Sequence, residues 1–227
     1  MFLSHNFKTQ NLYSWVLLSL LGIIWGSAFI SIKFAINDFN PVQIASLRII
    51  IAFLVVFLFS LVLRFQLFNI DRSLRYWLFC FGVAILSNVL PFTILSIAQE
   101  HLSTIFVGLS MSIIPLLITI FSFFLLNDEI ITQRKIWGVL IGLTGCTILV
   151  ISKATEDYEI NQGGNLVFLL LCILAPLSYS LGAIIIRKSK PANLLTFTTH
   201  ALFIASIISL PFLFIYGILP DKLDYKS

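Results

Sequence analysis

A cation inside an apolar segment is the residue in this sequence best suited to chemistry. Arg48 lies several residues into an apolar stretch that begins at Pro41. An arginine facing lipid at that depth costs roughly 3 kcal/mol, so it needs a polar or charged partner. Ala45 and Ala52 lie on the same helix face, which suits contact with a neighbouring helix. Two roles are open: Arg48 binds an anionic or carboxylate group of a solute in a cavity, or it bonds structurally to carbonyl groups at a helix end.

Lys33 and Trp25, in the preceding apolar segment, are the next candidates for a cavity wall. Lys33 shares a helix face with Gly22 and Gly26, which form a GxxxG step suited to close helix packing. Lys33 lies near the outer membrane boundary, so it either lines a cavity or extends its ammonium group toward the lipid headgroups. Trp25 falls near mid-membrane and not at an interface, and it either lines the cavity or packs against another helix.

Polar residues recur along one face of the segment 103–126, at spacings of three or four residues. Lipid does not favour such a stripe, so we expect it to face protein or water. Prolines near the middle of three segments remove backbone hydrogen bonds and permit kinks. The candidate cavity residues of the later segments are Asn88, Ser112, Pro115, Thr119, Tyr179 and His200. His200 is either a neutral histidine bonded to a hydroxyl or a proton-linked switch, because imidazole titrates near neutral pH.

Recognisable catalytic and metal-binding patterns are absent from the sequence. It has no P-loop, GxSxG or HExxH motif, and all ten acidic residues fall in loops or at segment ends. Cys80, Cys146 and Cys172 lie inside apolar segments without a CxxC pair, so we expect them to pack. The sequence therefore predicts no enzyme activity, no cofactor, no metal site and no carboxylate-based ion coupling within these segments.

The elements that must position these residues are membrane spans. Of the 227 residues, 59% are hydrophobic and only 11% are charged, and the mean hydropathy is +1.04. Soluble domains contain about one-quarter charged residues, and a span needs about 20 apolar residues. The sequence predicts an all-α polytopic membrane protein, which has the lipid bilayer as a partner. Its seven predicted spans are 13–35, 41–63, 75–98, 103–126, 132–151, 165–187 and 193–217.

Lysine and arginine residues indicate the orientation of the spans. Placing the N-terminus in the cytoplasm gives nine of these residues on the inside and three on the outside. The inside residues are Lys8, Arg64, Arg72, Arg75, Arg134, Lys135, Arg187, Lys188 and Lys190, and the outside residues are Lys153, Lys222 and Lys226. The net charge of +4 is then a consequence of topology, and we expect no nucleic-acid partner.

A faint internal repeat relates the two ends of the chain. Moving the sequence by 150 residues places Pro41 on Pro191 and aligns the second predicted span with the seventh, and the first with the sixth. Weak internal sequence symmetry of this kind is common in transporters. The polar segment 152–164 is the predicted linker between the two parts.

The fifth predicted span carries a glycine face. Gly138, Gly142 and Gly145 lie close enough in sequence to let another helix approach. This face packs either within the chain or against a second copy in a homodimer.

One set of residues follows a recognisable order: Trp25-Gly26-Ser27, Lys33, Pro41 and Arg48. This order resembles the EamA-type repeat of the drug/metabolite transporter superfamily. The resemblance covers one five-helix repeat at 13–151 and the first two helices of a second, inverted repeat at 165–217. Members of the family have ten spans and a central cavity, so against that pattern the chain looks truncated after seven spans.

The resemblance implies a secondary transporter that moves a small metabolite or drug-like solute through a central cavity. It also implies an inner membrane of a bacterium as the location. The alternative is a non-transporting fragment or membrane assembly component that packs through the glycine face of the fifth span.

Overall fold

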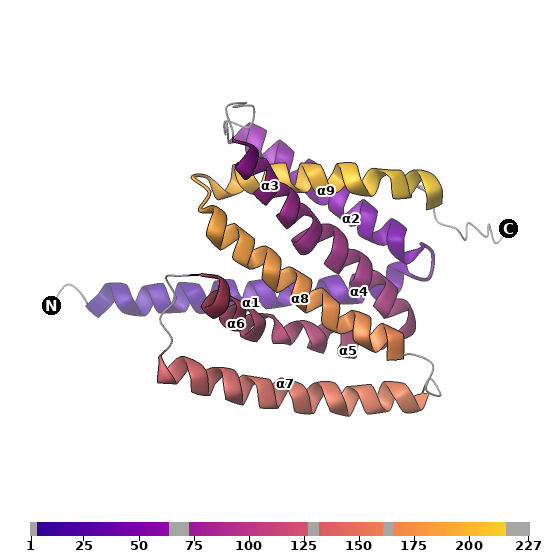
Figure 1. The fold of residues 1–227 in the computed structure, drawn as a ribbon, viewed down its shortest axis with the longest axis horizontal. Helices are drawn as coiled ribbons and strands as arrows, with labels where there is room; N and C mark the ends of the chain where they lie inside the picture. Colours follow the sequence, from indigo (N-terminus) through magenta and orange to yellow (C-terminus); the bar gives the residue numbers. More distant parts are fainter. Residues whose placement is uncertain (1–3, 64–72, 127–131, 161–165, 217–227) are drawn as a thin grey trace.

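The computed structural model describes residues 4–63, 73–126, 132–160 and 166–216. Within these ranges every regular element is a helix, and six helices are long and apolar enough to cross a membrane (Figure 1). At the fifth predicted span, the described residues include a shorter apolar helical stretch, Ile136–Gly145. The prediction of an all-α polytopic membrane protein is confirmed, and the chain is an integral multi-pass membrane protein.

The boundary between the first two helices shows how the sequence sets the depth of Arg48. α1 (Ser4–Ala35) starts earlier than predicted, and α2 (Pro41–Val62) begins at a proline, which suits the first helical position. Asn40 Oδ1 accepts a hydrogen bond from the Val42 N–H at 3.0 Å. Gln43 Oε1 accepts one from the Asn40 N–H at 2.7 Å. This capping box fixes where α2 begins, and Arg48 comes about two turns later.

The third span contains a π-helical turn. Its elements are α3 (Leu74–Val83), η1 (Ala84–Val89) and α4 (Leu90–His101). Pro91 has no N–H to donate to the preceding turn, and the Asn88 side chain donates from Nδ2 to the Val83 carbonyl at 3.2 Å. The extra residue in the turn rotates the side chains of α4 by about 100° relative to a regular α-helix.

α8 (Leu166–Ser189) packs closely against this π-helical turn. A Cβ atom added at Gly182 would overlap the Ser87 hydroxyl and lie 3.2 Å from the Ser87 backbone nitrogen. Four residues earlier on the same face, Ser178 donates from Oγ to the Leu86 carbonyl at 2.7 Å. A small residue and a hydrogen bond therefore hold α8 on η1.

The remaining elements match the predicted spans with one correction. They are α5 (Thr104–Ser110), η2 (Met111–Ile113), α6 (Ile114–Leu125), α7 (Gln133–Ile160) and α9 (Leu194–Tyr216). The segment 152–164, which we predicted as a linker, is helical as far as Ile160, because α7 continues past the predicted end at 151. The rest of that segment and residue 217 lie outside the described residues.

α2 and α9 form an antiparallel pair. Gln43 Nε2 donates to the Tyr216 carbonyl at 2.7 Å at one end, and the Ser60 and Thr199 hydroxyls lie 3.1 Å apart at the other. Between these two hydrogen bonds, the centroids of the Phe53 and Phe203 rings are 5.5 Å apart. The hydrogen bonds at both ends of the pair and the aromatic contact between them fix how α2 and α9 are aligned along their length.

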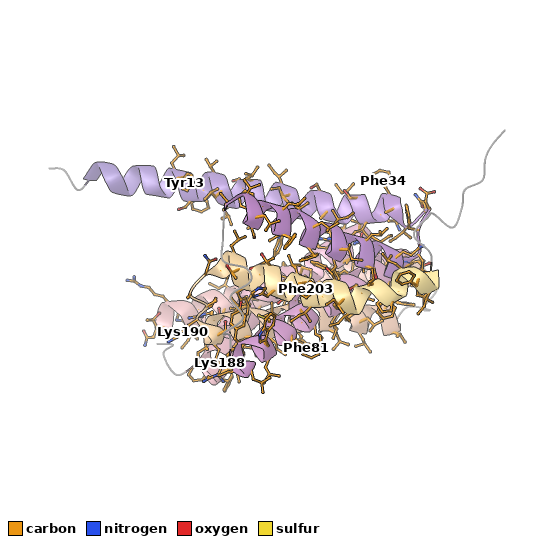
Figure 2. All side chains as sticks on the ribbon, turned by 90° about the horizontal axis from the view of Figure 1, so that it is seen from above. Tyr13, Phe34, Phe81, Lys188, Lys190 and Phe203 are labelled. Atoms are coloured by element: carbon orange, nitrogen blue, oxygen red, sulfur yellow. The ribbon has the colours of Figure 1, made fainter. Side chains whose placement is uncertain are left out.

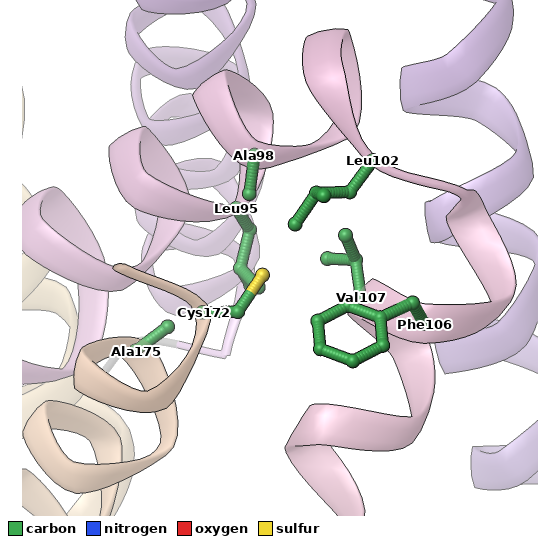
Figure 3. Packing of buried hydrophobic residues seen from close by; sticks show 7 residues of the cluster. All are labelled: Leu95, Ala98, Leu102, Phe106, Val107, Cys172 and Ala175. Atoms are coloured by element: carbon green, nitrogen blue, oxygen red, sulfur yellow. The ribbon is translucent and has the colours of Figure 1, made fainter. Parts of the chain in front are cut away.

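α3, η1, α4 and α8 pack with one another and with this pair. α7 lies along one edge of the bundle (Figure 1), and α1 lies along another (Figure 2). α1 has few neighbours, and its Tyr13 and Phe34 side chains are exposed (Figure 2). One hydrophobic core joins α4, α5 and α8 (Figure 3). Its buried residues are Leu95, Ala98, Leu102, Phe106, Val107, Cys172 and Ala175. Cys80 and Cys172 are buried in such cores, and the Cys146 side chain lies outside the described set.

The glycines predicted to pack helices mostly face open space within the described structure. A Cβ at Gly22, Gly26, Gly138 or Gly145 would meet nothing within 4 Å. Gly142 alone of the predicted set has a neighbour, the Leu116 side chain at 3.0 Å. Contact within the chain is therefore found at Gly142, while the tight contact at Gly182 was not predicted.

Candidate functional site

Four helices bring one cation and three aromatic rings together. The Arg48 guanidinium of α2 lies over the Phe92 ring of α4, with Cζ 4.4 Å from the ring centroid. Tyr179 of α8 lies within electrostatic range of Arg48. The edge of the Trp25 ring from α1 meets Tyr179 in a T-shaped contact, at 5.9 Å between centroids and 86°. We call these four residues the Arg48 cluster.

Arg48 has no carboxylate partner in the described part of the chain. The one ion pair among those residues joins His101 to Glu100 at 3.7 Å, at the far end of α4. A cation–π contact with Phe92 contributes roughly 0.5–2 kcal/mol, which is less than the cost of placing an arginine in the apolar layer. The half-buried guanidinium can therefore bind an additional anionic group.

An apolar groove lies beside Arg48, between the end of α1 and one face of α2. Its volume is about 610 Å³, and Arg48 is the only charged residue among the described residues that line it. The other lining residues are Ala35, Phe39, Ile44, Leu47, Ile51, Ala52, Val55 and Val56. Sites for small organic molecules have volumes of about 300–1,000 Å³ and apolar walls with a few polar groups. The groove is open, with Ile51 and Val55 exposed along it, so it offers an apolar surface with a single cation.

Lys33, near the end of α1, contacts α4. Its Nζ donates to the Gln99 backbone carbonyl at 3.2 Å, and its side chain is otherwise exposed. The Gln99 side chain is fully buried, and neither of its polar atoms has a hydrogen-bond partner among the described residues. The hydroxyl of Ser96, one turn earlier, is also buried without a partner there. An unpaired buried polar group costs about 1–3 kcal/mol, so these two side chains are available to a polar ligand or water.

Of the predicted cavity residues, the structure brings Trp25, Arg48 and Tyr179 together. Asn88 lies one turn from Phe92 on α4 and uses its amide to bond the Val83 carbonyl. It therefore supports the helix that carries Phe92.

The polar stripe of the fourth span does not join the Arg48 cluster. Ser112 and Pro115 are exposed, and Ser112 donates from Oγ to the Leu109 carbonyl at 2.6 Å. Thr119 donates to the Pro115 carbonyl at 2.8 Å and lies in a small apolar crevice between α6 and α7. The 3₁₀ turn η2 interrupts the period of 3.6 residues from which we predicted a single stripe.

His200 belongs to a separate aromatic group. Its Nδ1 lies 2.8 Å from the Tyr76 hydroxyl, and its ring centroid is 5.0 Å from that of Trp77. Thr199 beside it bonds to Ser60, which is 12 residues along α2 from Arg48, or roughly 18 Å at about 1.5 Å per residue. A histidine bonded to a hydroxyl was one of the two alternatives for His200, and the hydroxyl beside its ring is that of Tyr76 on α3.

Phe92 and Ser96 are members of this site that the sequence did not indicate. Gln99 shares one polar side of the third predicted span with Asn88, but it was not among the candidate cavity residues. In a regular α-helix Phe92 would share a face with Asn88, four residues earlier, but the π-helical turn η1 breaks that register. Gln99 is a polar residue near a helix end, where exposure is usual. Only the packed structure shows that its amide is buried.

Comparison with known proteins gives one family and two relatives. The model of the EamA-like transporter family matches residues 13–151. An uncharacterized transporter from Archaeoglobus fulgidus is 27% identical over 202 residues, which cover 88% of this chain and 67% of the relative. The uncharacterized transporter YoaV from Bacillus subtilis is 23% identical over 210 residues, which cover 91% of this chain and 69% of the relative. No solved structure matches the chain.

Proposed function

This chain belongs to the EamA-like transporter family, and we propose that it moves a small organic anion across the membrane with Arg48 as the binding cation. The observation that carries the proposal is the half-buried Arg48 guanidinium, which has no carboxylate partner in the described ranges and borders an apolar groove. The family and the two relatives, both named as transporters, support transport as the activity.

The chemistry of the groove favours a metabolite or drug-like solute with an apolar body and one anionic group. The groove walls repel a fully charged solute, because burying an unpaired charge among apolar side chains is costly. The guanidinium of Arg48 offers a fork of N–H donors that fits a carboxylate or another planar anion. Phe92 behind the guanidinium holds it in place without neutralising its charge.

The breaks in the helices around this site suit a carrier that changes shape. η1 and η2 interrupt the third and fourth spans, and Pro176 and Pro211 lie inside α8 and α9. Such breaks lower the cost of bending one part of a helix against the other. We propose a secondary transporter that opens to each side in turn, with the N-terminus in the cytoplasm and the bacterial inner membrane as its location.

Transport in proteoliposomes tests the role of Arg48. The solutes are a panel of aromatic and aliphatic organic anions, each paired with its neutral amide. We expect saturable uptake of some anions over their amides, and a loss of at least about tenfold in Arg48→Gln, which is about 1.4 kcal/mol. Arg48→Lys should keep part of the uptake, and Arg134→Gln, an exposed control at the start of α7, should keep all of it. Uptake that is unchanged in Arg48→Gln for every solute would show that Arg48 is not the binding cation.

The second candidate function, an assembly component, is favoured by the open glycine positions on α7. Gly138 and Gly145 face open space in the described structure, so a second copy could approach there. Gly142 is unsuitable for a test, because a larger side chain would first clash with Leu116 of the same chain. Gly138→Leu and Gly145→Leu should break a detergent-stable homodimer if this candidate is right, and an unchanged oligomeric state would contradict it.

A further inference from the structure

A second pocket lies at the end of the bundle where α3 begins and α8 passes into α9. Its volume is about 390 Å³. The lining residues are Ser73, Arg75, Tyr76, Phe79, Lys188, Ser189, Lys190, Pro191 and Ala192. Figure 2 shows Lys188 and Lys190 close together at one end of the molecule, away from the α1–α2 turn. This pocket shares no lining residue with the groove beside Arg48.

Three cations from two parts of the chain converge on the pocket. Arg75 comes from the first turn of α3, and its Cζ lies 5.5 Å from the centroid of the Phe79 ring. Lys188 and Lys190 flank the end of α8, and Lys190 adopts a left-handed backbone conformation, with φ of 43°. Among the described lining residues there is no aspartate or glutamate. Three cations lining one pocket give it a positive potential, which favours the binding of an anion.

The predicted orientation in the membrane explains why cations are numerous at this end of the chain, but it does not explain why three of them line one pocket. Cytoplasmic loops are rich in lysine and arginine, and a basic residue suits the C-terminal end of a helix. Neither effect requires residues from two distant parts of the sequence to line one pocket. Arg134, on the same predicted side of the membrane, is exposed and lines none of the pockets described above.

The depth of the pocket matches that of lipid headgroups. It lies at the ends of three spans, which start at Leu74, end at Ser189 and start at Leu194. Just inside the membrane from it, α3 exposes Leu78 and Phe81. A molecule with a charged head and acyl chains can therefore place its head in the pocket and its chains along α3.

We propose that this pocket binds the phosphate group of an anionic phospholipid. Arg75, Lys188 and Lys190 contact the phosphate, and the exposed apolar face of α3 contacts the acyl chains. Basic pockets between span ends are known binding places for such headgroups. The pocket is separate from the transport site, so lipid binding here does not depend on the proposed role of Arg48.

Native mass spectrometry of the full chain from detergent micelles tests the proposal. The probes are phosphatidylglycerol and phosphatidylcholine at equal concentration. We expect the protein to retain phosphatidylglycerol in preference. Each neutral substitution, Arg75→Gln, Lys188→Gln or Lys190→Gln, should reduce that preference by about fivefold, since one basic contact is worth about 1 kcal/mol. Arg134→Gln is the matched control and should leave the preference unchanged.

Two further measurements test whether the pocket binds the lipid through its two lysines and whether a soluble phosphate can replace that lipid. Lys188 and Lys190 are exposed, so the double variant Lys188→Gln/Lys190→Gln should fold and still lose most of the preference. An excess of soluble glycerol 3-phosphate should not displace the lipid, because it lacks acyl chains. Equal retention of both lipids by the parent chain, an undiminished preference in the double variant, or displacement by glycerol 3-phosphate would each overturn the assignment.

Discussion

Replacing Gly182 by alanine places a methyl group where α8 meets the π-helical turn η1. The new Cβ would overlap the Ser87 Oγ atom and lie 3.2 Å from both the Ser87 Cβ and the Ser87 backbone nitrogen. Both contacts cost free energy, because the hydroxyl must rotate out of its present position and the backbone nitrogen cannot move aside. α8 must therefore move by a few tenths of an ångström, which also stretches the 2.7 Å bond from Ser178 to the Leu86 carbonyl.

The expected cost is about 1–3 kcal/mol for inserting a methyl group into a packed contact. Weakening the Ser178 bond adds up to about 0.6 kcal/mol, the average for such bonds between membrane helices. The assay is equilibrium unfolding in mixed dodecylmaltoside and sodium dodecylsulfate micelles, monitored by circular dichroism. Gly182→Ala should unfold at a lower fraction of the ionic detergent than the parent chain.

Two variants control this experiment. Ser87→Ala removes the overlapping hydroxyl, so adding Gly182→Ala to it should cost less than adding Gly182→Ala to the parent chain. Gly138→Ala adds the same methyl group on α7, where nothing lies within 4 Å, and should be neutral. If Gly182→Ala is as stable as the parent chain, or if its cost is the same with and without the Ser87 hydroxyl, α8 does not pack on η1 as described.

Three other substitutions have outcomes that the structure predicts. Ser122→Ala should destabilise the chain by about 1–3 kcal/mol in the same unfolding assay, because Arg187 Nη1 loses its 2.9 Å bond to the buried Ser122 hydroxyl; an unchanged midpoint would contradict this. Tyr76→Phe removes the 2.8 Å bond to His200 and should lower the free energy of unfolding by about 0.6 kcal/mol in the same assay. A variant that is as stable as the parent chain, or more stable, would show that this bond contributes nothing to stability. A cysteine at exposed Asp38 should react with a membrane-impermeant maleimide in intact cells, and labelling only after permeabilisation would reverse the predicted orientation.

Much of the fold could be predicted from the sequence, because membrane spans are set by the length of apolar runs. Pro41 marks the start of α2 within its capping box, and the predicted span 193–217 corresponds to α9 (Leu194–Tyr216). The end of α7 could not be predicted in this way. The polar residues after 151 look like a linker in composition, but polar residues also continue a helix that leaves the apolar layer.

The candidate site could be predicted only in part. Arg48 and Trp25 were identified because a cation and an indole near mid-membrane are unusual whatever surrounds them. Periodicity misled the assignment of Ser112 and Pro115, since the 3₁₀ turn η2 rotates the side chains of α6 relative to those of α5. The burial of Gln99 depends on helices distant in sequence, which no local pattern specifies.

The contact between Phe53 and Phe203 bears on the predicted internal repeat of the chain. Under the predicted shift of 150 residues, Phe203 is the counterpart of Phe53, so each ring touches its own equivalent. In an assembly with two-fold symmetry, a residue meets its own equivalent only close to the axis, and such a contact is isologous. The pair therefore marks where a pseudo-two-fold axis would pass between α2 and α9. A single substitution there changes only one of the two rings, whereas in a symmetric homodimer the same substitution would change both.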